Sequence, residues 1–228
     1  MLNDIEWAPS LMCADFSRLG EEIHNLTHAG VHRWHFDVMD GHFVPNLTLG
    51  PDVLVSVRQL TQLPIDVHLM VESPEQFVEM MIDAGADRIY FHIEATRTPS
   101  RLIRHIRSRG VQAGVAINPA TPPAFLESIL HEVDGILVMT VDPGFAGQAF
   151  MPHVVDHIAY LKGQLDERNL QVPLMVDGQM HLQTVPRVVN AGAKQIVLGT
   201  SGLFRESDYE AALKRLQESA TSGGISLG

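Results

Sequence analysis

Eight short runs of β-branched and other apolar residues recur along this 228-residue chain, with helical spacing between them. Short apolar runs that alternate with helical segments are typical of buried parallel strands. Eight strand–helix units in one chain predict a single (β/α)8 barrel, the TIM barrel. A doubly wound open sheet is the alternative, but it usually has fewer strands and a Gly-rich first turn, which this chain lacks. The predicted strands are residues 7–12, 33–39, 65–70, 88–93, 111–117, 135–141, 172–177 and 195–200.

The helical segments between these strands have recognisable apolar stripes and ends. Three of them close on an Ala-Gly pair, at 29–30, 84–85 and 191–192, where glycine favours a left-handed helix end. The whole pattern predicts one catalytic domain over residues 1–220, followed by a Gly- and Ser-rich flexible tail at 221–228. In the segment SPEQFVEMMIDAG, the spacing predicts a buried stripe of Phe77, Met80, Met81 and Ala84.

Composition limits where the protein works and what it contacts. The chain is 45% hydrophobic and 19% charged, which is typical of a soluble globular protein. No apolar run reaches the roughly 18 residues of a membrane span, and the N-terminus does not resemble a signal peptide. Cys13 is the single cysteine, which suits a reducing compartment, so we expect a cytoplasmic protein. The formal charge of −11 disfavours nucleic acid and anionic membranes as partners.

The second predicted strand carries polar side chains on the face that would point into the barrel. His35 and Asp37 share this face because strand side chains alternate. In a barrel, functional groups gather at the C-terminal ends of the strands, where His68 and Asp177 also lie. Taken singly, each histidine has an ordinary hydrogen-bonded role as its alternative. Together the four predict a site for one divalent cation, zinc first and iron, manganese or cobalt as alternatives.

Other polar residues near these strand ends have simpler explanations. Asp66 shares the face of His68 but lies one layer deeper, which predicts a hydrogen-bonding role. His92 has a similar placement without a matching carboxylate, so we expect it to pack or to support a ligand. Asp40 and His42 fit loop contacts. Methionines at strand tips usually pack, but three at one barrel mouth could form a soft wall over a reactive carbon: Met39, Met70 and Met139.

Three Gly-rich turns follow predicted strands six, seven and eight. Glycine lets backbone N–H groups approach an anion closely, and barrels often bind phosphate at these loops. An acidic chain needs such local donors to hold an anionic substrate. The predicted phosphate-binding residues are Gly144, Phe145, Ala146 and Gly147 after strand six, Gly178 and Gln179 after strand seven, and Gly199, Thr200 and Ser201 after strand eight.

The absent residue types narrow the chemistry. No lysine stands at a strand tip, which argues against a Schiff-base aldolase, and no Asp-x-Lys-x-x-Asp run is present. A metal that contacts both oxygens of an α-hydroxyketone would stabilise an enediolate. Asp37 and Asp177 could then remove a proton on one face and return one on the other, which inverts carbon 3. A sugar-phosphate lyase or decarboxylase, and a barrel that only binds a phosphorylated sugar, are the alternatives.

Several long stretches carry a resemblance to a known family: APSLMCADF, HFDVMDGHFVPNLTLGP, PIDVHLMVESPEQF, AGVAINPATP, VMTVDPGFAGQAF and VDG. With these the chain resembles the ribulose-phosphate 3-epimerase family over nearly its whole length. The resemblance implies a metal held by His35, Asp37, His68 and Asp177, with Asp37 and Asp177 also the acid–base pair. It further implies that Ser10 contacts substrate, that the backbone of 144–147 covers the phosphate, and that Gly178, Gly199 and Thr200 lie near it.

Two details depart from the usual pentose-phosphate pattern. Gln179 stands where a second glycine is common, and the last strand ends in GTSGLF. The stretches SLMC, GFAGQ and GTSGLF resemble the allulose-6-phosphate 3-epimerase branch. We therefore expect a ketose phosphate as partner, D-ribulose 5-phosphate first and D-allulose 6-phosphate as the alternative, and a homo-oligomeric enzyme.

Overall fold

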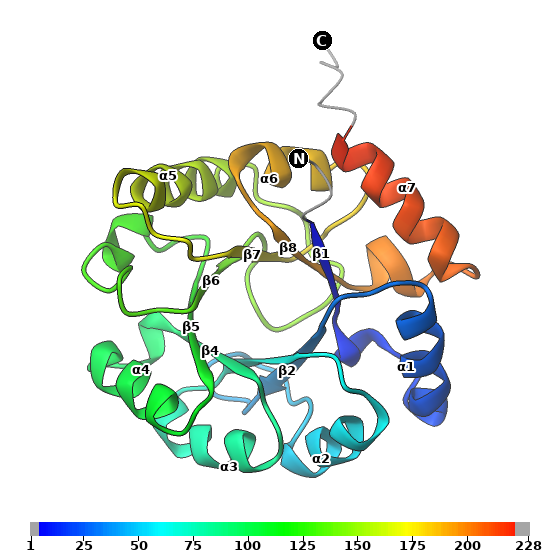
Figure 1. Cartoon of the computed structure of the whole chain (residues 1–228), viewed down its shortest axis with the longest axis horizontal. Helices are drawn as coiled ribbons and strands as arrows, with labels where there is room; N and C mark the ends of the chain where they lie inside the picture. Colours follow the sequence, from blue (N-terminus) through cyan, green and yellow to red (C-terminus); the bar gives the residue numbers. More distant parts are fainter. Residues whose placement is uncertain (1–4, 222–228) are drawn as a thin grey trace.

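The computed structural model describes residues 5–221 and shows a ring of eight parallel strands surrounded by helices (Figure 1). Hydrogen-bonded neighbours follow the order β1-β8-β7-β6-β5-β4-β3-β2. A parallel bridge between Ser10 and His35 joins β1 to β2 and completes the ring. The predicted TIM barrel is confirmed. The strands are β1 Glu6–Pro9, β2 Trp34–Met39, β3 Ile65–Met70, β4 Arg88–His92, β5 Gln112–Ile117, β6 Gly135–Met139, β7 Leu174–Asp177 and β8 Gln195–Leu198.

The helices lie on the outside of the ring (Figure 1). The α-helices of the described residues are α1 Leu19–His28, α2 Pro51–Leu60, α3 Val78–Asp83, α4 Pro99–Ser108, α5 Val154–Glu167, α6 Val185–Ala191 and α7 Tyr209–Thr221. Between β5 and β6 the described chain forms only the 3-10 helix η5, Pro123–Leu126, followed by turns, so this unit lacks an α-helix. The predicted tail lies outside the described residues except for Thr221.

Several local predictions need correction. The predicted strands six and eight end two residues early, at Met139 and Leu198, and strand seven begins two residues late, at Leu174. The first strand ends at Pro9 rather than residue 12, because the Cys13 N–H bonds to the Ser10 carbonyl and closes the turn η1, Leu11–Cys13. The predicted stripe of α3 is wrong at Met80, which is 44% exposed, whereas its neighbour Met81 is buried. The residues that α3 buries are Val78 and Met81, so its apolar face is centred away from Met80.

Glycine closes helices where the sequence predicts it. Gly30, Gly85 and Gly192 have φ values of 93°, 105° and 119°, in the left-handed region. At Gly192 the N–H bonds to a carbonyl of the last helical turn of α6. The three Ala-Gly turns are therefore confirmed as helix ends.

Strand alternation produces two separate apolar layers. Trp34, Phe36 and Val38 on β2 point outward and pack in the large cluster between barrel and helices. A smaller cluster fills the barrel interior, made of Ala8, Tyr90, Ala116, Leu137, Met139, Met175 and Val197. Because the interior is packed below, the inward polar side chains of β2 and β3 are held at the C-terminal mouth.

A buried hydrogen-bond network closes the opposite end of the barrel. Arg33 Nη1 donates to both Asp66 oxygens, at 2.8 and 2.6 Å, and its Nε donates to Glu6 at 2.9 Å. Arg88 donates to Gln112 and to the Tyr90 hydroxyl. The prediction that Asp66 has a hydrogen-bonding role is confirmed. Pairing offsets the cost of burying these charges.

Gly114 is expected to be essential for packing inside the barrel. A Cβ there would lie 2.2 Å from the Tyr90 ring, which is fully buried. Gly114→Ala should destabilise the fold by about 1–3 kcal/mol, the usual range for overpacking, as measured by urea unfolding. Gly163→Ala on α5 is the matched control, because nothing lies within 4 Å of its added methyl group. That change should stabilise by roughly 0.5–1 kcal/mol. Equal effects at both sites would contradict the packing argument.

Candidate metal centre

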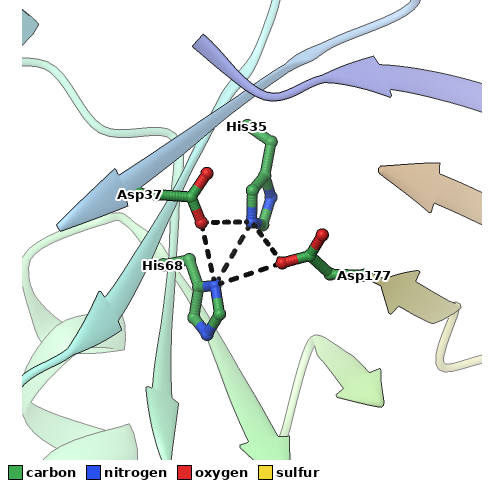
Figure 2. Close-up of side chains that lie close together, drawn as sticks. All are labelled: His35, Asp37, His68 and Asp177. Atoms are coloured by element: carbon green, nitrogen blue, oxygen red, sulfur yellow. Dashed lines mark hydrogen bonds and ion pairs between the residues drawn. The ribbon is translucent and has the colours of Figure 1, made fainter. Parts of the chain in front are cut away.

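Four side chains from three strands meet at the C-terminal mouth of the barrel (Figure 2). β2 supplies His35 and Asp37, β3 supplies His68, and β7 supplies Asp177. One ligand atom from each lies within 4.8 Å of all the others. The two histidines are fully buried, and Asp177 exposes 20% of its side chain. Asp177 is therefore the member of the group most open to the mouth.

The distances inside this group fit a single small cation. His35 Nε2, His68 Nδ1 and Asp37 Oδ1 are 3.2–3.3 Å from one another. Asp177 Oδ2 is 3.9 Å from each of the two ring nitrogens. Ligands about 2.0–2.2 Å from a tetrahedral zinc would be roughly 3.3–3.6 Å apart. The donor set, two imidazoles and two carboxylates, also suits zinc, iron, manganese and cobalt.

Each aspartate uses one oxygen toward the histidines and directs the other elsewhere (Figure 2). The second Asp37 oxygen accepts a hydrogen bond of 2.5 Å from the Ser10 hydroxyl. Ser10 is 4% exposed and lies at the end of β1. Its observed contact is thus with Asp37, which it orients. Its predicted contact with substrate stays a prediction.

The surrounding protein groups shift the pKa values of Asp37 and Asp177 in opposite directions. Burial raises the pKa of Asp177 to about 7, and the nearby Asp37 charge adds to this. Burial acts on Asp37 in the same direction, but His35 and His68 outweigh it and hold its pKa well below the ordinary value. For His35, burial lowers the pKa, yet Asp37 beside it raises the net value to about 9. Environments that separate two carboxyl pKa values are typical of acid–base sites.

A cavity opens directly above these ligands. Its floor and one wall include Asp37, Asp177 and the methionines at the tips of β2, β3 and β6. Met39 and Met70 pack with Val44 in a small apolar cluster of their own. All three predicted methionines border the cavity: Met39, Met70 and Met139.

The Gly-rich turns predicted to bind phosphate border the same cavity. The structure places all of the predicted turn residues along its lining: Gly144, Phe145, Ala146, Gly147, Gly178, Gln179, Gly199, Thr200 and Ser201. The loop after β2 reaches over to this side, since the Asn46 amide donates to the Gly144 carbonyl at 2.7 Å. Gly178 and Gly144 have φ values of 118° and 120°, which other residues rarely adopt. Gln179 takes a positive φ of 52° as well.

The sequence reasoning missed part of the cavity wall. Met12 and Cys13 border it because η1 folds back over the barrel mouth. The predicted first strand includes Met12, and no site role is predicted for Cys13. The remaining lining residues that were missed are Val141, Asp142, Pro143 and Val197. Val197 follows the inward parity of β8, so strand alternation could have identified it.

The fold and the site together define a TIM-barrel protein with a two-histidine, two-aspartate metal-ligand cluster beside Gly-rich rim loops. A sequence profile of the ribulose-phosphate 3-epimerase family matches residues 6–204. The chain belongs to this family, which confirms the resemblance.

Relatives that carry the family name cover nearly the whole chain. Ribulose-phosphate 3-epimerase of Bacillus subtilis (strain 168) is 42% identical over 94% of this chain and 99% of its own. The Synechocystis enzyme of the same name is 44% identical and covers 96% of each chain. That of Escherichia coli (strain K12) is 41% identical, over 92% of this chain and 93% of its own.

Solved structures of other enzymes share the fold alone. A 3-hexulose-6-phosphate synthase superposes with a TM-score of 0.64 at 16% identity, over 95% of this chain and 99% of its own. A thiamine phosphate pyrophosphorylase from Pyrococcus furiosus superposes with a TM-score of 0.65 at 13% identity, over 100% of this chain and 99% of its own. Among the described residues, no helix has the length and apolar character needed to cross a membrane.

Proposed function

We propose that this chain is a metal-dependent epimerase that inverts carbon 3 of a ketose phosphate, with D-ribulose 5-phosphate and D-xylulose 5-phosphate as the interconverted pair. The observation that carries the proposal is the approach of Asp37 and Asp177 to one pair of histidines, from strands separated around the ring by β8 and β1. Family membership and the names of the curated relatives support the same reaction and sugar.

In this proposal the two aspartates exchange protons with carbon 3. The carboxylate with the lower pKa, Asp37, is suited to accept a proton at neutral pH. Asp177, which approaches the same two histidines from β7, would deliver one from the other face. Ser10 keeps the reactive carboxylate of Asp37 in place through its hydrogen bond. In the reverse direction the two roles exchange.

His35, Asp37, His68 and Asp177 would hold the divalent ion, for which zinc is the first candidate. When bound, this ion supplies positive charge that stabilises the two oxygens of an enediolate. The methionine tips would cover the planar carbon skeleton with a surface that carries no charge and donates no proton. An apolar cover of this kind limits the access of water to the carbanion-like intermediate.

The substrate phosphate would lie against the turns that follow β6, β7 and β8. Support comes from the glycines there, whose backbone approaches the cavity without intervening side chains. No lysine borders the cavity, so backbone N–H groups and the hydroxyls of Thr200 and Ser201 are the donors that we assign.

Gly199→Asp is expected to raise the KM for the ketose phosphate by at least about tenfold, because it places a carboxylate beside the proposed phosphate position. The backbone tolerates a side chain there, since φ is −102° and an added Cβ lies 3.4 Å from the Cys13 sulfur. Gly199→Asn is the matched control of nearly the same size without the charge. Steady-state kinetics should show a much smaller rise in KM for it. An unchanged KM in Gly199→Asp would show that the substrate phosphate does not bind beside Gly199.

The sugar itself is tested by one direct comparison. Turnover of D-ribulose 5-phosphate should exceed that of D-allulose 6-phosphate on the same preparation. The relatives' names favour the pentulose, whereas the stretches SLMC, GFAGQ and GTSGLF resemble the allulose branch. A higher kcat/KM for D-allulose 6-phosphate would leave the proposed carbon 3 epimerisation in place and show that the substrate is the hexulose phosphate.

A further inference from the structure

One buried histidine next to the metal-ligand cluster has no role in the chemistry described above. His92 ends β4 and is fully buried. Its Nε2 lies 2.9 Å from His68 Nε2, on the side of His68 away from the cluster. Figure 2 shows this second nitrogen of His68 pointing away from the other three ligands. The two ring planes are 25° apart and their centroids are 5.1 Å apart, so the two nitrogens meet edge to edge and the contact lies near both ring planes.

The chain of contacts continues beyond His92. Its other nitrogen, Nδ1, lies 3.2 Å from Glu94 Oε2. The second oxygen of Glu94 accepts the Asn118 N–H at 2.9 Å. Burial favours the neutral form of Glu94, but the hydrogen bonds from His92 and its neighbours outweigh this and hold its pKa below the ordinary value. The relay therefore ends on a carboxylate that is itself fixed by backbone.

Only one arrangement of protons lets neutral rings satisfy this chain while His68 Nδ1 serves as a ligand. A ligating nitrogen carries no proton, so the proton of His68 resides on Nε2. His68 Nε2–H then donates to His92 Nε2, which must be the acceptor. The proton of His92 consequently resides on Nδ1 and is donated to Glu94. Every polar atom in the relay has a partner in this assignment.

The other ligand histidine has no such support. His35 Nδ1 is buried and has no hydrogen-bond partner among the described residues. The orientation of His35 therefore depends on packing and on its contacts within the cluster. Of the two ligand histidines, only His68 has a hydrogen-bond partner outside the four-residue cluster among the described residues that can fix its tautomer and ring orientation.

We infer that His92 and Glu94 are positioning residues that fix His68 in its metal-binding tautomer and orientation. This inference rests on the proposed metal centre. Hydrogen bonds from a ligating histidine to a second residue commonly change metal affinity by about 10–100-fold when they are removed. The relay should therefore act on zinc affinity rather than on folding.

The test is the zinc dissociation constant, measured by competition with a chromophoric chelator. His92→Phe keeps a ring but removes the acceptor, so zinc affinity should fall by about 10–100-fold. His92→Gln should retain more affinity, because its amide oxygen can accept from His68 Nε2–H. Glu94→Gln should also weaken binding, since His92 and Asn118 donate to different oxygens of Glu94, and the amide replaces one of them with an NH2 donor.

Glu79→Gln is the matched control, because it alters a histidine–glutamate pair with His105 at the protein surface. Its zinc affinity should equal that of the unmodified chain. Melting temperatures in excess chelator separate folding from binding: a merely structural role would lower them and leave the dissociation constant unchanged. Unchanged zinc affinity in both His92→Phe and Glu94→Gln would overturn the relay alone. An unmodified chain that binds no zinc would overturn the proposed metal centre together with it.

Discussion

Exhaustive chelation is expected to reduce epimerase activity by roughly 10³-fold or more. The ion that the four-residue cluster is proposed to hold supplies several kcal/mol of charge stabilisation to the enediolate, and about 4 kcal/mol corresponds to a thousandfold in rate. The measurement is the initial rate of epimerisation before and after treatment with a strong chelator. Metal content of the dialysed protein should fall from one ion per chain to near zero in parallel.

Readdition separates metal loss from damage to the fold. Zinc, manganese, cobalt or iron(II) added back singly should restore activity, and the metal that restores it best at stoichiometric amounts identifies the working ion. Circular dichroism should change little on chelation, because the apolar layers on both sides of the strands do not depend on the site. Activity that survives complete removal of metal would contradict the proposed mechanism.

Strand parity explains why so much of the site was predictable. A polar side chain on a strand that is buried on both faces costs free energy unless it has a partner or a function. His35 and Asp37 on β2 are therefore recognisable as candidate site residues. Parallel strands in a barrel bring their C-terminal ends to one mouth. This geometry alone predicts that His68 and Asp177 lie with them. Their gathering is observed, whereas their individual roles in catalysis and binding stay predictions.

Features that depend on contacts between distant elements could not be predicted in this way. The pairing of Arg33 with Asp66 depends on the register of β2 against β3, and this register cannot be predicted from the sequence alone. His92 was expected to pack or to support a ligand, but its 2.9 Å contact with His68 depends on the neighbouring positions of β3 and β4. The contact of Met12 with the cavity could not be predicted, because the apolar run after β1 has the pattern of a continuing strand. The structure instead forms the turn η1 there.

Replacing either of the two proposed catalytic aspartates by asparagine is expected to lower turnover by at least roughly 10²–10⁴-fold, the usual contribution of an acid–base group. Asn cannot carry the proton that Asp37 or Asp177 exchanges with carbon 3. Both residues are also proposed ligands, so loss of activity alone would not separate the two roles. Metal content must therefore be measured for each variant, and kinetics compared only at full loading.

Isotope exchange in D₂O separates the proton-transfer role from ligation. With one carboxylate on each face, the unmodified enzyme should incorporate solvent deuterium at carbon 3 during epimerisation, as detected by NMR or mass spectrometry of the product. A metal-loaded Asp177→Asn variant retains Asp37, which Ser10 still holds in place. We expect that variant to exchange the carbon 3 hydrogen of one epimer without inverting the centre. Asp37→Asn should show the same behaviour with the other epimer.

The choice of epimer in each variant makes the prediction specific to two opposed carboxylates. A single base that served both faces would lose exchange with both epimers in one variant and with neither in the other. Complete retention of hydrogen by the unmodified enzyme at full conversion would count against the enediolate route. Because Asp177 exposes 20% of its side chain, we expect its carboxyl proton to exchange with solvent, so internal return of one proton should not produce complete retention. From the geometry of β2 and β7 we expect deuterium to enter carbon 3 during inversion in the unmodified enzyme. In each metal-loaded variant we expect it to enter one epimer only, without inversion.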